Sequence, residues 1–264
     1  MKRFVFVLMV ITTVISFVVK AEAFPGEGLV LHLSFDQSTI EGDKVKDLSE
    51  QGNDGVIFGA EVTPGGIFEE ALQLNGIDAY VEVPLKPSIT FSRDDNSFTI
   101  QIWVKGDPDA IPPSETYFIG NYGAGSLPFW ALGTLDPPNT GRMTFHLRDT
   151  DGQYQLISTE DNSFFDGKWH QLVGIRDVEK KEVRFYIDCA LINKVESQTG
   201  VVDSGNAIWI GRVLDRYIQG LVDDAKIWNR ALSDDELQMS MEASQAINPS
   251  SKTATLWGLV KKHH

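Results

Sequence analysis

The sequence predicts an all-β protein with one short helix near its C-terminus. Apolar residues alternate with polar ones over several short stretches, and turn-forming residues separate these stretches at regular intervals. A helical start signal occurs late in the chain, and helical periodicity is otherwise almost absent. Many short strands joined by turns are typical of a β-sandwich or a β-barrel.

The clearest alternation lies in residues 29–35, 98–104 and 183–187, where Leu, Phe, Ile or Val occupies every second position. Successive side chains of a strand point to opposite faces, so one set in each stretch is expected to face a core. Between the strands lie turn signals of the Asn-Gly or Asp-Gly kind, such as Asn75-Gly76 and Asp151-Gly152.

The helix signal is the sequence Ser233-Asp234-Asp235-Glu236, which has the pattern of a capping box. Its acidic residues also suit the positive end of the helix dipole. We therefore expect a short helix over residues 234–244, placed so that it closes one edge of the sandwich.

Composition narrows the class of protein and the class of partner. The chain has 264 residues, is 42% hydrophobic and 23% charged, and has a formal net charge of -14. A body of this size can bury a core without disulfides, and its acidity argues against nucleic acid or an anionic membrane as a partner. Cys189 is the only cysteine, so it is either a buried small apolar residue or an odd exposed thiol.

The N-terminus has the pattern of an export signal, with a basic start, an apolar run over residues 4–19, and Ala21-Glu22-Ala23 as a cleavage site. An uncleaved membrane anchor is the alternative. We expect a signal peptide over 1–23, one domain over 24–245 and a flexible tail over 246–264. The tail is either a frayed end or a docking tag. The mature protein is then exported, to the outside, the periplasm or the cell surface, without membrane insertion.

Seven segments, taken in order, resemble the laminin G-like jelly-roll domains of the concanavalin A-like group. They are Leu31-His32-Leu33-Ser34-Phe35-Asp36, Asp47 with Gly52-Asn53-Asp54-Gly55, Ala71-Leu72-Gln73-Leu74-Asn75-Gly76 leading to Tyr80-Val81-Glu82-Val83-Pro84, Phe98-Thr99-Ile100-Gln101-Ile102-Trp103-Val104, Asp166-Gly167-Lys168-Trp169-His170, Phe185-Tyr186-Ile187-Asp188, and Gly220-Leu221-Val222-Asp223-Asp224 through Trp228-Asn229-Arg230-Ala231-Leu232-Ser233.

The resemblance extends over about residues 29–240 and implies a two-sheet antiparallel jelly-roll sandwich. Cys189 departs from it, because the family has glycine after the aspartate of that hairpin, where backbone freedom matters. Family members bind carbohydrate or other extracellular ligands, and many carry a calcium ion. For this chain the resemblance implies a glycan or an extracellular protein as the partner, and it leaves the oligomeric state open.

The resemblance also implies a structural Ca²⁺ between the first and last strands, where carboxylate, amide and carbonyl oxygens would be its ligands. Asp223 matches the last-strand ligand, Asp36 can face it from the end of the first strand, and Asn53 is a third candidate. In the alternative interpretation, Asp223 caps backbone N–H groups and Asp36 is an exposed turn residue.

Sugar binding needs exposed aromatic rings and planar polar groups. The candidates lie in the middle of the chain and are Tyr122, Trp130, His146, Arg148 and Tyr154. Each of them can instead be an ordinary half-buried residue, because the sequence does not determine which face of a strand it occupies.

No catalytic motif is present. The Glu-x-Asp-x-x-Glu strand of similar sandwich glycosidases is absent, as is Gly-x-Ser-x-Gly, and the histidines form no metal-binding spacing. We therefore expect a non-catalytic binding module, with carbohydrate as its ligand. The alternatives are a protein-interaction or adhesion module, and a glycoside hydrolase with an acid pair of another pattern.

Overall fold

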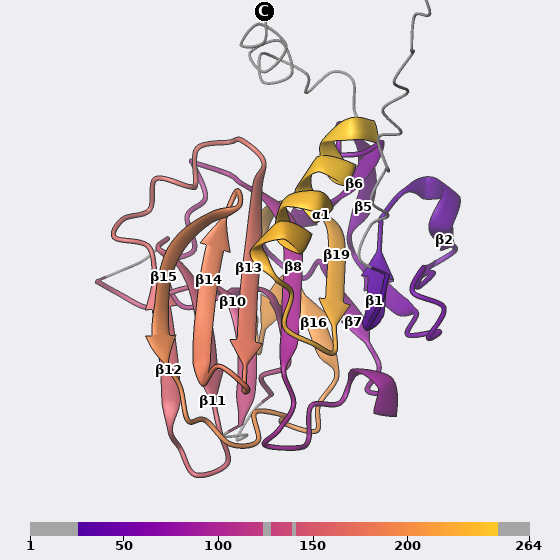
Figure 1. Cartoon of the computed structure of the whole chain (residues 1–264). Coiled ribbons are helices and arrows are strands. Elements are labelled where there is room, and N and C mark those ends of the chain that lie inside the picture. The colour runs from indigo at the N-terminus through magenta and orange to yellow at the C-terminus, as the bar shows by residue number, and fades with distance from the viewer. Residues whose placement is uncertain (1–25, 124–127, 139–140, 248–264) are drawn as a thin grey trace, which may run out of the picture.

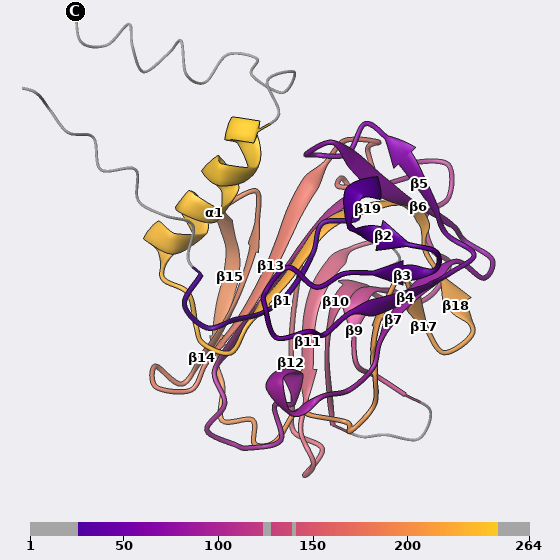
Figure 2. The same ribbon diagram turned by 90° about the vertical axis from the view of Figure 1, so that its right-hand side faces the viewer.

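The protein is a sandwich of two antiparallel sheets, as the sequence predicts (Figures 1 and 2). The computed structural model describes residues 26–123, 128–138 and 141–247. Every strand pairing in these residues is antiparallel, and the largest hydrophobic cluster lies between the two sheets. The predicted all-β class and jelly-roll architecture are confirmed.

The first sheet has eight strands. In spatial order they are β15 (Ala190–Glu196), β14 (Glu182–Ile187), β13 (His170–Asp177), β8 (Phe98–Gly106), β19 (Gln219–Trp228), β6 (Glu70–Asn75) and β5 (Glu61–Pro64), with β1 (Leu29–Leu33) paired to β19.

The second sheet has nine strands. In spatial order they are β12 (Tyr154–Ser158), β11 (Met143–Arg148), β10 (Phe129–Thr134), β9 (Tyr117–Gly120), β16 (Ile208–Ile210), β7 (Tyr80–Val83), β4 (Gly55–Phe58), β3 (Lys44–Val45) and β2 (Ile40–Glu41). A separate hairpin of β17 (Arg212–Val213) and β18 (Arg216–Tyr217) follows β16. Two 3₁₀ turns, η1 (Gln37–Thr39) and η2 (Pro87–Ile89), lie in connections.

Alternation explains which side chains form the core. In β8, Phe98, Ile100, Ile102 and Val104 point into the cluster between the sheets. The opposite set is buried as well, because the segment around α1 (Asp234–Ile247) covers that face of the sheet. Thr99 Oγ1, for example, donates to the carbonyl of Arg230 at 2.9 Å.

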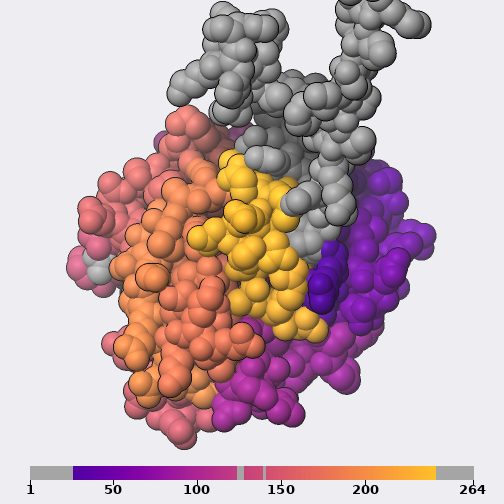
Figure 3. All heavy atoms as spheres, viewed as in Figure 1, coloured from indigo at the N-terminus to yellow at the C-terminus, as the bar shows by residue number. Residues whose placement is uncertain are grey.

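Helix α1 begins where the capping box predicts, but it does not close an edge of the sandwich. It lies across the outer face of the eight-stranded sheet (Figure 3). Leu232 and Leu237 there join a hydrophobic cluster with Val173, Ile175 and Trp228. The prediction of an edge position was wrong, because the apolar surface that needs cover lies on the sheet face.

The β14–β15 hairpin shows why glycine is usual at the position of Cys189. Asp188 and Cys189 form its turn, and both have left-handed backbones, with φ of 52° and 61°. The Cys189 thiol is partly buried and lies 3.7 Å from Gln171 Oε1 and from the Leu237 carbonyl. The residue therefore accepts an unfavourable φ at a site that the helix covers.

The predicted signal peptide over 1–23 and most of the predicted tail over 246–264 lie outside the described residues, and both stay predictions. Within the described chain, no helix has the length and apolar character needed to cross a membrane.

The capping box is formed, and it gives a stability prediction. Glu236 accepts from the Ser233 backbone at 2.9 Å and from two Arg230 nitrogens at 2.6 and 2.9 Å. Arg230 lowers the pKa of Glu236 to about 2. The contact therefore stabilises the fold fully at pH values above 4.5, the ordinary glutamate pKa, and this stabilisation is lost as the pH falls towards 2.

We expect Glu236→Gln to lower the free energy of unfolding by about 1 kcal/mol at pH 7 and to have little effect near pH 2. Urea denaturation at both pH values measures this. The control is Asp235→Asn, an exposed acid in the same helical turn. Equal losses for Glu236→Gln at both pH values would contradict the assignment.

Candidate functional site

The outer face of the nine-stranded sheet carries one aromatic ring from each of seven strands. We call it the aromatic face. Its strand residues are Phe58 on β4, Tyr80 on β7, Trp209 on β16, Tyr117 on β9, Phe129 on β10, His146 on β11 and Tyr154 on β12.

Strand alternation places these rings away from the core. Trp209 stands between Ile208 and Ile210, and both isoleucines point into the main core. Likewise, His146 stands between the core residues Phe145 and Leu147. The outer face of the other sheet is covered by α1, whereas this face lies on the opposite side of the molecule (Figure 2).

The β17–β18 hairpin divides the aromatic face into two halves. Val213 and Leu214 of the hairpin pack on Tyr117, Phe129 and neighbouring residues, and they form a cluster separate from the main core. Figure 2 shows the hairpin on the side of the molecule opposite to α1. On one side of it lie the rings of β10, β11 and β12, and on the other side those of β16, β7 and β4.

The first half is the β10–β12 patch, defined as Tyr122, Phe129, His146, Arg148 and Tyr154. The ring centroids follow one another closely, with Tyr122–Phe129 at 4.9 Å, Phe129–His146 at 4.6 Å and His146–Tyr154 at 6.1 Å. Tyr154 is 64% exposed. Arg148 lies between Phe129 and Tyr154 in the strand register, and its Nε is buried without a hydrogen-bond partner in the part of the chain that the structure describes.

Glu115 supplies a carboxylate beside this patch. It accepts from the Tyr117 hydroxyl at 2.7 Å, and its Oε1 lies 3.4 Å from His146 Nδ1. Burial would raise the pKa of Glu115, but hydrogen bonds from His146 and Tyr117 outweigh burial and hold that pKa below its usual value. Burial and the Glu115 carboxylate raise the pKa of Tyr117. Glu115 is therefore an acceptor at neutral pH and not a proton donor.

Trp130 does not belong to the patch. It is 1% exposed and packs in the core against Phe91 and Phe98, with centroids at 6.3 and 6.1 Å. Its assignment as an exposed ligand residue was wrong, because its position in β10 points inward while Phe129 points outward. The structure brings Tyr122, His146, Arg148 and Tyr154 together.

The predicted calcium site has one strong structural indication, at Asp223 on β19. Its Oδ2 accepts from the Ile67 backbone at 2.7 Å, while its buried Oδ1 has no hydrogen-bond partner among the described residues. Burial first, and then repulsion from Asp224 and Asp36, raises the pKa of Asp223 to about 8. Asp224, by contrast, forms an ion pair with Lys226 and a hydrogen bond with His32 at 2.8 Å. A cation beside Asp223 would compensate the negative charge of its ionised carboxylate.

Asp36 and the segment 66–70 provide further oxygens near Asp223. Asp36 Oδ1 accepts from the Glu70 backbone at 3.2 Å. A Cβ on Gly66 would lie 2.0 Å from the Glu70 carbonyl oxygen and 2.7 Å from Asp223 Oδ2, so these two oxygens converge on one space. In the described chain no group of three His, Cys, Asp or Glu side chains could hold a metal, so Ca²⁺ here would also need carbonyls and water. Within that limit the residues fit Ca²⁺.

The structure does not bring Asn53 to this place. Its amide nitrogen donates to the Val30 carbonyl at 2.6 Å, and its Oδ1 accepts from Ser88 at 3.0 Å. Val30 lies in the first half of β1, whereas Asp36 follows the other end of that strand. Asn53 is a buried structural residue whose polar atoms are already used.

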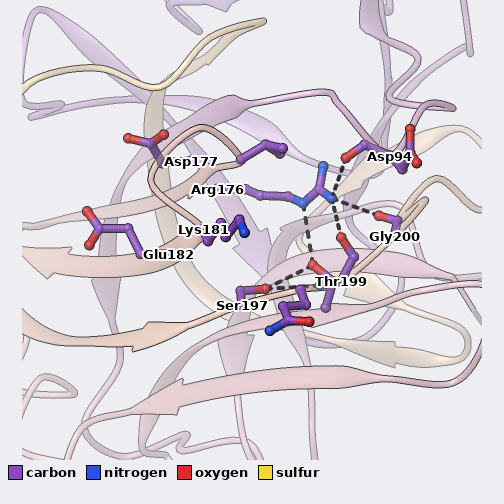
Figure 4. A pocket seen from close by; sticks show the side chains of 10 residues that line it. Asp94, Arg176, Asp177, Lys181, Glu182, Ser197, Thr199 and Gly200 are labelled. Atoms are coloured by element: carbon purple, nitrogen blue, oxygen red, sulfur yellow. Dashed lines mark hydrogen bonds between the residues drawn. The ribbon is translucent and has the colours of Figure 1, made fainter.

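A hollow of about 310 Å³ at Arg176 is structural rather than a ligand site. Figure 4 shows the guanidinium surrounded by polypeptide. It donates to the carbonyls of Asn96, Asp94, Thr199 and Gly200, so it joins two loops and has little capacity left for a ligand.

The comparisons with known proteins agree with the fold. The family described as the concanavalin A-like lectin/glucanases superfamily matches residues 75–238. The chain belongs to this superfamily. No curated protein matches the sequence.

Solved structures similar to this superfamily member include binding domains of toxins. The binding domain of Paraclostridial Mosquitocidal Protein 1 is 22% identical, with a TM-score of 0.64 and 82% of this chain covered. The binding domain of botulinum neurotoxin DC is similar in two complexes. The complex with SialylT is 20% identical, with a TM-score of 0.65 and 83% of this chain covered. The complex with rat synaptotagmin II is 18% identical, with a TM-score of 0.64 and 84% of this chain covered. The alignment spans about half, 52%, of each of those chains.

Sequence reasoning missed Phe129 of the β10–β12 patch, and it missed Glu115 and Tyr117 beside the patch. The alternation within residues 129–134 could have indicated Phe129, because it is out of phase with Trp130 and Leu132. Tyr117 is the first residue of β9, and Glu115 lies two residues before it. All four residues of β9 are buried and its pairing with β10 is irregular, so the sequence shows no alternation of apolar and polar residues there.

The opposite placement of Trp130 and Tyr154 is testable. Trp130→Ala should lower the free energy of unfolding by about 3–5 kcal/mol, because it empties part of the core. Tyr154→Ala should change it by less than about 0.5 kcal/mol, because the ring is exposed. Chemical denaturation followed by circular dichroism measures both values, and similar losses in the two variants would contradict the assignment of faces.

Proposed function

We propose that this protein is an exported, non-catalytic glycan-binding module whose ligand lies on the β10–β12 patch. The observation that supports the proposal is the gathering of Tyr122, Phe129, His146 and Tyr154 in ring contact on a sheet face that no described helix covers. Phe129 is buried beneath this group, and Tyr154 is its most exposed ring. Aromatic rings offer flat apolar surfaces with little conformational entropy to lose. The apolar faces of sugar rings can stack on them.

Planar polar groups at the same place would give the patch its specificity. Arg148 supplies donors, Glu115 supplies acceptor oxygens, and His146 can do either according to its tautomer. Sugar hydroxyls both donate and accept, so this set suits a neutral sugar. The pattern is typical of ligand sites with a mostly apolar surface and a few placed polar groups.

A hydrolytic role fits this site less well. Glycoside hydrolysis needs a carboxylic acid whose pKa is raised so that it can protonate the leaving group. The pKa of Glu115 is instead lowered by its hydrogen bonds from His146 and Tyr117. A buried carboxylate of this kind holds its neighbours in place and accepts hydrogen bonds.

A protein partner is the second candidate, and one observation favours it. Tyr154 and Leu156 are 64% and 37% exposed on β12, which is an edge strand of the nine-stranded sheet. An exposed edge with apolar side chains can pair with a strand of another chain. Among the similar toxin domains, one structure is a complex with SialylT and another is a complex with rat synaptotagmin II, and this chain spans about half of each of those chains.

We expect glycan binding to depend on the patch. Tyr154→Ala should weaken retention on a bound polysaccharide at least tenfold without lowering the melting temperature. His146→Ala should weaken it by a similar factor and also lower the melting temperature, because Glu115 and Phe129 lose a contact. Ile77→Ala should retain wild-type binding. Ile77 is the matched control, because it is 74% exposed and lies outside the patch. The measurement is retention of the full chain on a panel of immobilised glycans. A folded protein that no glycan retains would overturn the proposal and favour the protein partner.

The proposed Ca²⁺ would stabilise the fold by compensating Asp223, and it would take no part in chemistry. We expect Ca²⁺ to raise the melting temperature of the wild type and to leave those of Asp223→Asn and Asp36→Asn unchanged. Asp78→Asn is the control, because Asp78 is an exposed turn residue bonded to Asn75. Differential scanning calorimetry with Ca²⁺ and with EDTA measures this. Equal melting temperatures of the wild type in the two buffers would show that no stabilising ion binds.

A further inference from the structure

The second half of the aromatic face surrounds an arginine with three rings. We call this group the arginine cage and define it as Arg212 with Tyr80, Trp209 and Tyr217. The Arg212 guanidinium carbon lies 4.5 Å from the ring centroid of Tyr80, 5.5 Å from that of Trp209 and 5.7 Å from that of Tyr217. Phe58 stacks on the far side of Tyr80 at 4.6 Å and extends the apolar surface.

Arg212 has no polar partner of its own in the described chain. No carboxylate there lies within 4.0 Å of its nitrogens, and its Nε is buried without an acceptor. The terminal nitrogens make no hydrogen bond to a described residue and remain accessible to solvent. The rings therefore hold the guanidinium plane in place, while its outer edge stays available.

Two other buried arginines, Arg176 and Arg184, use their polar groups within the fold, whereas Arg148 shares with Arg212 a buried Nε without a hydrogen-bond partner in the described chain. Arg176 donates to four backbone carbonyls. Arg184 contacts Asp177, Asp234 and the Tyr186 hydroxyl. The chain has 37 acidic residues against 23 basic ones, so pairing an arginine is easy. A cation left unpaired in such a chain is suited to an anion from outside.

We infer that the arginine cage binds the carboxylate of an acidic sugar residue. A planar guanidinium can hold a carboxylate through two parallel hydrogen bonds, and contact with aromatic faces reduces its hydration and fixes its orientation. That the ligand is a sugar rests on the proposed glycan-binding function. That this sugar carries an acidic group rests on the arginine cage itself.

Glu82 distinguishes a sugar acid from a simple anion. It accepts from Trp209 Nε1 at 2.9 Å and so holds the indole beside Arg212. The Glu82 carboxylate has further acceptor capacity, which sugar hydroxyls can use. Its charge repels any anion at Arg212, so only a ligand that also brings hydroxyl groups gains a compensating contact from Glu82. Rings, one cation and one acceptor together match a molecule with an apolar ring face, an acidic group and hydroxyls.

The cage lies near enough to the β10–β12 patch to serve the same chain of sugars. Trp209 on β16 and Ala131 on β10 both pair with Gly120 of the intervening strand β9, which places β16 and β10 about 10 Å apart. The β17–β18 hairpin stands between the two groups and carries Arg212 itself. The aromatic face thus provides one position for a neutral sugar and another for an acidic one.

Calorimetric titration of the full chain tests the inference with matched ligands. The first pair is a galacturonate oligomer and its methyl ester, and the second is sialyllactose and lactose. We expect the wild type to bind at least one acid at least tenfold more tightly than its neutral partner. Whichever acid binds identifies the source of the carboxylate, a uronate or a sialate.

Arg212→Gln should remove this preference, and Arg212→Lys should weaken it severalfold, because lysine lacks the planar pair of donors. Arg93→Gln is the control, because Arg93 is an exposed arginine of a loop, paired with Asp95. If Arg212→Gln fails to fold, the arginine Nε–H signals of the wild type in a nuclear magnetic resonance spectrum replace it. The acid should then shift the signal of Arg212 and leave that of Arg93 unchanged.

A folded Arg212→Gln variant that keeps the acid preference would overturn the inference and leave the cage as a clasp for the hairpin. A wild type without any acid preference, or an unmoved Arg212 signal, would do the same. All three results are distinguishable from failure of the proposed function, because retention of neutral glycans through Tyr154 is measured separately.

Discussion

The packing of two sheets on one shared core is the constraint on which the rest of this structure depends. Each strand can bury only one face against the other sheet, so every second side chain is directed outward. On the eight-stranded sheet the outward residues would leave apolar groups such as Val173 and Ile175 exposed, and α1 covers them. On the nine-stranded sheet seven strands direct an aromatic ring outward, and no helix of the described chain covers them.

This asymmetry gives the two outer faces different roles. The covered face is structural, and its polar residues bind to one another beneath the helix, as Ser240 does with Gln101. The aromatic face has its own small cluster around the β17–β18 hairpin, and this cluster keeps the rings in fixed positions. Rings held by a rigid sheet lose little entropy when a ligand binds, so the face is preorganised for recognition.

Strand β19 places two adjacent buried carboxylates in very different surroundings. Asp224 is held between Lys226 and His32, whereas Asp223 receives only backbone hydrogen bonds on one oxygen. The register of β19 shifts between Asp223 and Lys226, and Asp224 has a left-handed backbone. This irregularity lets the Asp223 and Asp224 side chains enter different surroundings. Burial and the neighbouring carboxylates raise the pKa of Asp223 to about 8 and so favour its protonated form, and a bound cation beside it would favour the ionised form instead.

The sequence alone determined the class of fold, the alternation that defines strands such as 98–104, and the start of the helix at its capping box. These features depend on residues close together in the chain, and local pattern is sufficient to predict them. The sequence also indicated four residues of the β10–β12 patch. Only the tertiary structure decided that Trp130 is a core residue and that Asn53 is used elsewhere. It alone showed that α1 covers a face and that Arg212 stands among rings from β7, β16 and β18. The reason is physical: a shift of one residue in a strand reverses the face of every side chain, and contacts between distant strands depend on the order in which the sheet assembles.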